Sequence, residues 1–160
     1  VFVGGHSAGG YLAAAIGFDA SYLAKVGVNT NQLAGLVPMS PQVFTHFTIR
    51  KERGVADAEK IPVIDEAAPA YHLRPDAPRT LVLVGDKDWP ARLEECQYFV
   101  AMAQQVTKHP EISLVVIADR NHGSILGNSA KAEDPGMKAM LDFLRSEPKP
   151  STQPTTQPAP

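Results

Sequence analysis

Short runs of aliphatic and β-branched residues recur along the first 146 residues, and they predict buried strands. Four such runs occupy residues 1–4, 33–39, 80–84 and 111–118. Each is a nearly continuous apolar run of strand length, and glycine or proline follows the first three. Runs of this kind are typical of strands that are covered on both faces, as in a parallel sheet.

Alanine-rich and amphipathic stretches alternate with these strands and predict helices. Residues 11–18 are rich in alanine, while residues 91–106 and 133–145 place apolar side chains on one face. A shorter helix is predicted at 67–73, and residues 21–31 indicate a turn-rich connection. Strands that alternate with helices predict an α/β protein whose mostly parallel sheet is built with right-handed crossovers and flanked by helices.

Two segments depart from this alternation. Residues 41–68 mix aromatic and charged side chains without a clear period, which predicts an insertion or lid. Residues 147–160 are rich in Pro, Thr and Gln and contain no large hydrophobic side chain, so we expect a disordered tail or linker. The predicted organisation is one partial domain over residues 1–146, followed by this tail.

Composition excludes several classes of protein. The chain has 160 residues, enough for one ordinary domain, and its formal net charge is −2. That balance predicts no nucleic-acid partner, and no apolar run approaches the roughly 20 residues of a membrane span. A single cysteine, Cys96, excludes an internal disulfide. Composition does not define the cellular location or the oligomeric state.

The sequence GHSAG at residues 5–9 matches the G-x-S-x-G pattern of a nucleophile elbow. Such a turn projects the hydroxyl of Ser7 from the edge of a sheet, and glycines flank the serine because neighbouring backbone comes very close. The backbone amide of Ala8 then points at a developing oxyanion. The alternative is a glycine-rich turn that binds phosphate, but no G-x-G-x-x-G pattern or P-loop lysine accompanies it.

A serine nucleophile requires a base, and the base requires a carboxylate that orients it. His122 follows the strand predicted at 111–118, and we expect it on a tight loop. Asp88 follows the strand at 80–84 and is the predicted acid, with Asp86 as the alternative acid or a turn cap. The order Ser7, Asp88, His122 is that of α/β-hydrolases.

Other side chains have weaker assignments. His6 occupies the variable position of the elbow, and Phe44, His46 and Phe47 lie in the predicted lid, so these four are possible substrate-pocket residues. A plain packing role is the alternative for both phenylalanines. His, Asp and Glu show no metal-ligand spacing, and we expect no metal.

Three segments carry a resemblance to a known family. GGHSAGGYLAA, LVLVGDKDWPARLEECQYF and DRNHGSI resemble the C-terminal half of α/β-hydrolase esterases and lipases. The pattern is similar to carboxylesterase-like members related to hormone-sensitive lipases and feruloyl esterases, and it extends over about residues 1–146. The resemblance implies a Ser–Asp–His triad that forms an acyl-enzyme with a small-molecule ester and needs no cofactor.

The resemblance also implies parts that these 160 residues do not contain. They are the first strands of the sheet and an H-G-G-type loop that supplies a second oxyanion donor. Loss of one such donor can cost about a hundredfold in rate, and a shortened sheet exposes a strand edge. We therefore expect residues 1–160 alone to fold poorly and to be nearly inactive.

Two other functional hypotheses remain open from the sequence. A serine peptidase or an arylformamidase could use the same three residues on the same fold. A non-catalytic, hydrolase-like binding domain is the hypothesis from a different class, although loss of catalysis usually removes the nucleophile or the base. Acyl and alcohol specificity are not defined by these residues.

Overall fold

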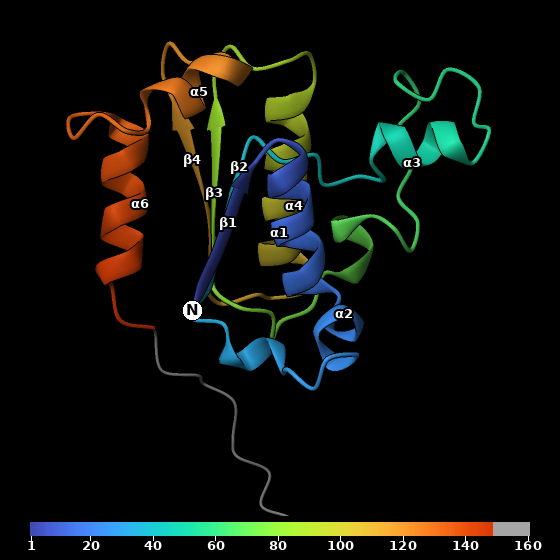
Figure 1. Ribbon diagram of the computed structural model, residues 1–160, viewed down its shortest axis with the longest axis horizontal. Helices are drawn as coiled ribbons and strands as arrows, with labels where there is room; N and C mark the ends of the chain where they lie inside the picture. Colours follow the sequence, from blue (N-terminus) through green and yellow to red (C-terminus); the bar gives the residue numbers. More distant parts are fainter. Residues whose placement is uncertain (149–160) are drawn as a thin grey trace, which may run out of the picture.

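A four-stranded parallel sheet forms the centre of the protein (Figure 1). A computed structural model describes residues 1–148, so the predicted tail lies almost entirely outside the described residues. The sheet order is β1-β2-β3-β4. The bounds of its strands are β1 Phe2–His6, β2 Gly35–Met39, β3 Thr80–Gly85 and β4 Ile112–Ile117. The predicted α/β class is confirmed, and each strand lies within two residues of its expected position.

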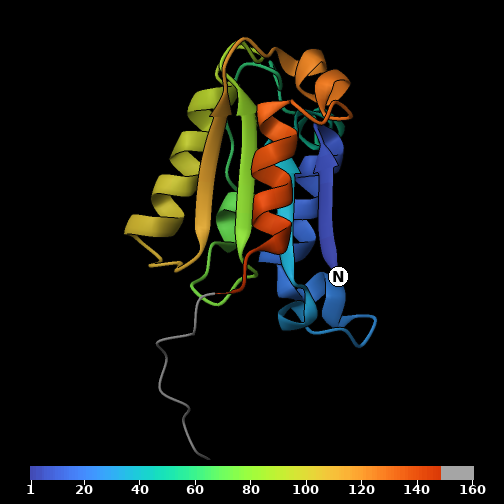
Figure 2. The same cartoon turned by 90° about the vertical axis from the view of Figure 1, so that its left-hand side faces the viewer.

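Helices cover both faces of the sheet (Figure 2). Helices α1 (Ala8–Phe18) and α4 (Arg92–Gln105) pack on one face, and α6 (Pro135–Arg145) packs on the other. Alternate residues of β3 divide between these layers, as the two-residue period of a strand requires. Val82 and Val84 belong to the core shared with α1 and α4, whereas Leu81 and Leu83 belong to the core beneath α6.

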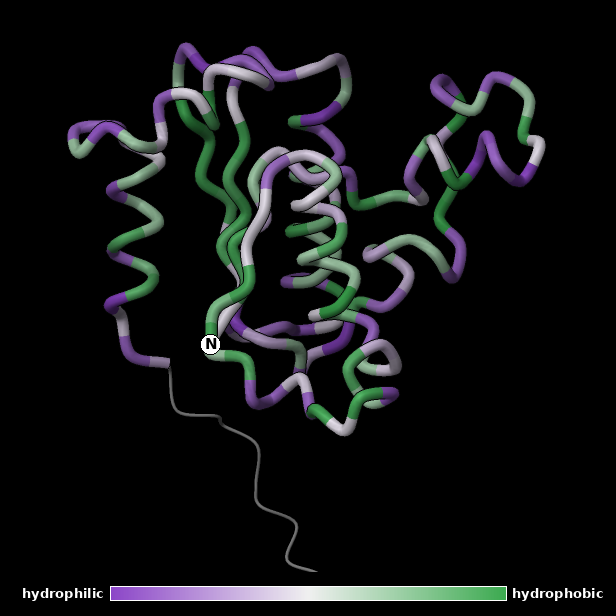
Figure 3. The backbone as a smooth tube through the Cα atoms, viewed as in Figure 1, coloured by the Kyte–Doolittle hydropathy of each residue, from purple (hydrophilic) through white to green (hydrophobic). Residues whose placement is uncertain are grey.

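Close packing of α1 against the sheet explains its small side chains. Ala13, Ala14 and Ala15 are buried, and a Cβ built at Gly17 would lie only 2.2 Å from Cδ1 of Leu36. A larger residue at position 17 would therefore push the helix away from β2. Figure 3 shows the strands as predominantly hydrophobic, with many hydrophilic residues in the connections at their carboxyl ends.

Several short helices were not predicted or were predicted differently. Helix α2 (Ala20–Ala24) begins one residue before the supposed connection 21–31 and overlaps it, and α5 (His122–Asn128) follows β4 where a loop was expected. The helix predicted at 67–73 is a single 3-10 turn, η2 (Pro69–His72), and another, η1 (Thr30–Gln32), precedes β2. All are too short to produce a hydrophobic period, and α5 contains two glycines, which disfavour helix.

The segment 41–68 extends away from the sheet layers and carries one short helix, α3 (Phe47–Glu52) (Figure 1). Its start is tied to α4, because Oε1 of Glu95 accepts hydrogen bonds from the amides of Val43 and Phe44 at 2.6 and 2.8 Å. Thr45 donates to Asp65 at 2.7 Å and joins the two ends of the segment. A role as a lid stays a prediction.

Candidate active site

Ser7 lies on a strained turn between β1 and α1. Its backbone has φ 57° and ψ −119°, a conformation that L-residues rarely adopt, and its amide donates to the carbonyl of Met39 at 2.9 Å. A Cβ at Gly5 would lie 2.5 Å from the backbone carbon of Gly9, so only glycine fits there. These features match the elbow predicted from the G-x-S-x-G pattern.

The three residues of the predicted triad form a continuous hydrogen-bonded chain. Nε2 of His122 lies 2.8 Å from Oγ of Ser7, and Nδ1 of His122 lies 2.8 Å from Oδ1 of Asp88. They follow β1, β3 and β4, and the carboxyl ends of parallel strands meet at one edge of a sheet. If Nδ1 carries the proton, Nε2 accepts from the Ser7 hydroxyl, which is the arrangement a general base needs.

The carboxylate of Asp88 is buried and held from two directions. Its side chain has no solvent exposure, Oγ of Ser40 donates to Oδ2 at 2.5 Å, and the amide of Trp89 donates to Oδ1 at 2.7 Å. Ser40 follows β2, is fully buried and has a positive φ of 45°. Sequence reasoning missed Ser40, since a serine between Met39 and Pro41 carries no distinctive motif.

The alternative acid, Asp86, lies elsewhere in the same loop. It is exposed, and its Oδ1 accepts a hydrogen bond from the amide of Arg120 at 3.2 Å. Asp86 therefore joins the loops after β3 and β4, as a turn-capping carboxylate would. The structure brings Asp88, and not Asp86, to His122.

His122 is fixed by its neighbours on both sides. It is the first residue of α5, rather than part of the expected tight loop, and Asn121 caps that helix by accepting from the amides of Gly123 and Ser124. The ring of Trp89 stacks on the imidazole with centroids 3.7 Å apart. Nε2 of His6 lies 2.7 Å from the carbonyl oxygen of His122 and donates to it.

His6 thus supports the site through its contacts with His122. Its ring centroid lies 4.7 Å from that of His122. Burial lowers the pKa of His6, the backbone hydrogen bond to His122 opposes this shift, and the neighbouring His122 ring adds to it. The lowered pKa favours the neutral imidazole of His6 at neutral pH.

The amide of Ala8 is the candidate oxyanion donor. Ala8 is the first residue of α1, so its N–H has no acceptor within the helix. It follows Ser7 directly and lies at the positive end of the helix dipole. An oxyanion that forms beside Ser7 would therefore meet an amide that is free of intrahelical bonding.

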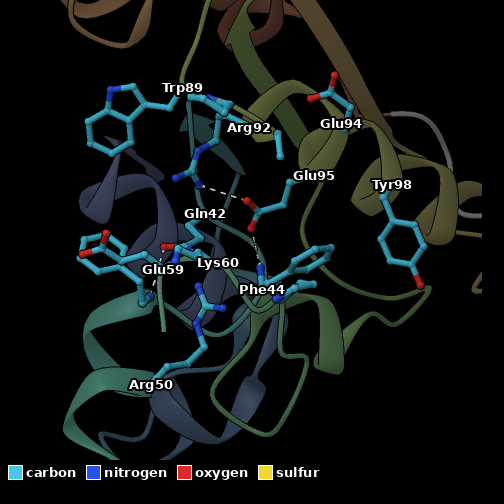
Figure 4. Close-up of a pocket in the computed structure, with 14 residues that line it drawn as sticks. Gln42, Phe44, Arg50, Glu59, Lys60, Trp89, Arg92, Glu94, Glu95 and Tyr98 are labelled. Atoms are coloured by element: carbon cyan, nitrogen blue, oxygen red, sulfur yellow. Dashed lines mark hydrogen bonds and ion pairs between the residues drawn. The ribbon is translucent and has the colours of Figure 1, made fainter. Parts of the chain in front are cut away.

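A cavity of about 830 Å³ opens beside the site, between the segment 41–68 and the start of α4 (Figure 4). Trp89, which stacks on His122, forms one wall. Two predicted pocket residues, Phe44 and Phe47, line this cavity, whereas His46 does not. The His46 ring stacks on Phe47 with centroids 4.4 Å apart, and its Nδ1 accepts from the amide of Thr48.

Two further searches concern the described residues only. No group of three or more His, Cys, Asp or Glu side chains within residues 1–148 is arranged to hold a metal ion. Over the same residues, none of the helices has the length and apolar character that crossing a membrane requires.

Fold and site together define the class of protein. A parallel sheet that presents a serine on a strained strand-to-helix turn, next to a histidine after a later strand, is the α/β-hydrolase arrangement of serine hydrolases. The model of the prolyl oligopeptidase family, Peptidase_S9, matches residues 1–149. The chain belongs to the prolyl oligopeptidase family.

Solved structures support the same fold. Esterase 2 of Thermogutta terrifontis is similar with a TM-score of 0.60 and 16% identity, over 89% of this chain and 52% of that chain. S-formylglutathione hydrolase (FrmB) of Staphylococcus aureus is similar with a TM-score of 0.54 and 16% identity, over 89% and 50%. The chain thus spans about half the length of these proteins, and the predicted resemblance to carboxylesterase-like α/β-hydrolases is confirmed.

None of the curated proteins compared with the chain matches it significantly in sequence.

Proposed function

We propose that the protein is a carboxylic ester hydrolase that forms an acyl-enzyme on Ser7. The observation that carries this proposal is the hydrogen-bonded chain from Ser7 through His122 to Asp88, with 2.8 Å at each step. Such a chain supports activation of a serine hydroxyl, because the base is adjacent to the nucleophile and the acid orients the base.

In the first half of the reaction, Oγ of Ser7 attacks the ester carbonyl while Nε2 of His122 takes the hydroxyl proton. Asp88 holds the proton on Nδ1 and stabilises the imidazolium. The amide of Ala8 donates to the oxyanion of the tetrahedral intermediate. When the intermediate collapses, Nε2 returns the proton to the leaving alcohol, and the acyl group stays on Ser7.

In the second half, a water molecule takes the place of the alcohol. It gives a proton to Nε2 of His122 as its oxygen attacks the acyl carbon. Collapse of this second intermediate breaks the bond to Oγ, returns the proton to Ser7 and releases the carboxylic acid. Water and the ester are the only reactants, so the sequence of steps balances without a cofactor.

The structural neighbours favour an ester as the substrate. Structures of esterase 2 of Thermogutta terrifontis include a propionate-bound form and phosphoramylated, phosphonylated and phosphorylated forms. The Staphylococcus aureus neighbour is named as an S-formylglutathione hydrolase. These proteins are similar in fold, and their chemistry supports the proposal by analogy.

The second proposed function is that of a serine peptidase. The observation that favours it is the match to the prolyl oligopeptidase family. The same nucleophile, base and acid would act on an amide, with His122 protonating a leaving amine. An arylformamidase is the corresponding alternative for N-formyl aromatic substrates, and a non-catalytic binding domain is the alternative outside enzymes.

Active-site labelling tests the nucleophile. The protein expressed from its complete reading frame is treated with a fluorophosphonate probe, and mass spectrometry locates the adduct. We expect one adduct at Ser7 that disappears in Ser7→Ala and His122→Ala, while Ser21→Ala, a change at an exposed serine on α2, keeps full labelling. A folded protein that takes up no probe would overturn the proposal and favour a binding domain.

Substrate profiling then separates the enzyme classes. p-Nitrophenyl esters, peptidyl p-nitroanilides and N-formyl aromatic amines are compared by kcat/KM on the same preparation. We expect the esters to be hydrolysed best. A preference for peptidyl anilides would replace the esterase proposal with the peptidase, and a preference for formamides would replace it with the arylformamidase.

A further inference from the structure

The cavity beside the candidate triad contains two buried arginines that the proposed mechanism does not use. Arg50 comes from α3 and Arg92 is the first residue of α4, and both line the cavity (Figure 4). Arg50 is 3% exposed and Arg92 is 7% exposed. Arginine is rarely buried to this extent unless its charge is paired.

The guanidinium of Arg50 lacks a hydrogen-bond partner within residues 1–148. Its Nε and Nη1 are buried without an acceptor, and so is Nε of Arg92. Burial of such donors costs free energy unless an acceptor compensates for the lost water. Two arginines with free donors at one cavity therefore indicate an acceptor that enters the cavity.

The two buried guanidiniums indicate that this acceptor is negatively charged. Glu95 is the carboxylate next to the two arginines, and its Oε2 lies 3.4 Å from Nη1 of Arg92. Its other oxygen already accepts two backbone amides, those of Val43 and Phe44. Two buried guanidiniums thus share one largely committed carboxylate, and Asp65 adds a smaller electrostatic interaction with Arg50.

A carboxylate suits this site better than a phosphate. The planar fork of a guanidinium matches a carboxylate, which adds only one negative charge to the site. A phosphate monoester carries close to two charges at neutral pH. Glu59, Lys60 and Glu94 also line the cavity, and because two of these three exposed side chains are carboxylates, a dianion would meet more repulsion than a monoanion.

The remaining walls suit an apolar chain or ring. Phe44, Phe47, Trp89 and Tyr98 line the cavity, and Trp89 connects it to the imidazole of His122. A ligand that places its carboxylate at Arg50 would therefore run past aromatic side chains toward Ser7. Such a lining, apolar with a few polar groups that set orientation, is typical of small-molecule sites.

We propose that this cavity binds a carboxylate that the substrate carries on an apolar spacer, with Arg50 and Arg92 as the carboxylate-binding pair. The inference rests on the proposed function, because the ligand is taken to be an ester that Ser7 attacks. It names a substrate class: esters in which the acyl or the alcohol portion ends in a carboxylate.

A binding measurement tests the site independently of catalysis. Phenylvalerate and its uncharged primary amide are titrated by calorimetry into the protein expressed from its complete reading frame. The two probes share ring and spacer and differ in charge. We expect the acid to bind about tenfold or more tightly than the amide, as hydrogen bonds to charged groups commonly contribute that much.

Variants then assign the preference to the arginine. Arg50→Met removes the guanidinium whose Nε and Nη1 lack an acceptor, and we expect it to abolish the preference for the acid. Arg50→Lys keeps the charge but not the fork and restores part of the preference. Arg145→Met removes an exposed arginine at the end of α6 and serves as the matched control, with the preference unchanged.

Equal binding of acid and amide by the unaltered protein would overturn the inference, because Arg50 would then find its partner within the protein. An acid preference that survives in Arg50→Met would overturn the assignment to this residue. The first outcome remains readable if Arg50→Met fails to fold, since it needs no variant, and Arg50→Lys then tests the assignment to Arg50.

A kinetic comparison separates this inference from the proposed function. The p-nitrophenyl half-ester of glutaric acid is compared with p-nitrophenyl valerate, which tests a carboxylate on the acyl portion. 4-Acetoxybenzoate is compared with its methyl ester, which tests a carboxylate on the alcohol portion. We expect a higher kcat/KM for one anionic member, with the ratio lost in Arg50→Met. Hydrolysis of the neutral esters as fast as that of the anionic esters would overturn the carboxylate site and leave the esterase proposal standing. Binding of phenylvalerate in preference to its amide, without hydrolysis of any ester, would overturn the esterase proposal and leave the carboxylate site standing.

Discussion

At the scale of single residues, the candidate site depends on side chains that are far apart in the sequence. Ser7, Asp88 and His122 are separated by at least 34 positions, yet the distances along their chain are 2.8 Å. Each is held by a further contact: Ser7 by the hydrogen bond from its amide to Met39, Asp88 by Ser40, and His122 by His6 and Trp89. Such positioning is what an acyl-transfer site needs.

The two acids of the β3 loop give a matched pair of variants. Asp88→Asn keeps the shape but removes the charge that stabilises the imidazolium, so we expect kcat for ester hydrolysis to fall by about a thousandfold or more. Asp86→Asn changes an exposed carboxylate that accepts from the amide of Arg120, and we expect a change of less than about threefold. Steady-state kinetics on both variants checks this, and comparable losses would contradict the assignment of Asp88.

At the scale of elements, the turn from β1 to α1 decides where the nucleophile points. The two glycines of its motif have different roles. A Cβ at Gly5 would collide with the backbone of Gly9, whereas a Cβ at Gly9 would meet nothing within 4 Å. Gly5 is therefore required by close approach, while Gly9 occupies an ordinary helical position in α1.

Alanine substitutions separate these roles. We expect Gly5→Ala to destabilise the protein by about 3 kcal/mol or more and to abolish fluorophosphonate labelling, because backbone must move to admit the methyl group. Gly9→Ala should be neutral or stabilising by up to about 1 kcal/mol, since alanine favours helix. Denaturant unfolding with labelling of both variants provides the measurement, and equal stability of the two would contradict the role of Gly5.

At the scale of the whole molecule, the sheet brings the site together and the segment 41–68 adds the cavity. The carboxyl ends of the parallel strands share one edge, and α5 lies at that edge (Figure 1). Glu95 of α4 fastens the start of the segment 41–68 through two backbone amides. The partial domain, the lid and the poor folding of residues 1–160 alone stay predictions.

Global stability should depend on pH through His6. Burial lowers the pKa of His6 in the folded state, so between that value and the ordinary 6.5 the unfolded chain binds more protons. This contribution to stability is present above pH 6.5 and is lost as pH falls through the folded pKa. Denaturant unfolding at a series of pH values should show a smaller acid-side loss for His6→Gln than for the unaltered protein, and identical profiles would contradict the prediction.

Local patterns were enough to predict the strands, the three long helices and the strand-to-helix turn that carries Ser7. The short helices α2 and α5 were not predicted, because five to seven residues are too few to show the hydrophobic period of a helix. The order of Ser7, Asp88 and His122 came from the α/β-hydrolase pattern, while Ser40 and the support from His6 carried no sequence signal. Likewise, the sequence marked 41–68 as unusual but did not indicate that Arg50 is buried.

The sequence by itself determined the parallel α/β sheet and the placement of Ser7 at a strained turn, because apolar runs and close glycine contacts are local properties. Only the tertiary structure decided that Asp88 rather than Asp86 faces His122, that Ser40 donates to Asp88 and that Arg50 and Arg92 share a cavity. These features depend on contacts between residues on different elements, and such contacts exist only after the elements have packed.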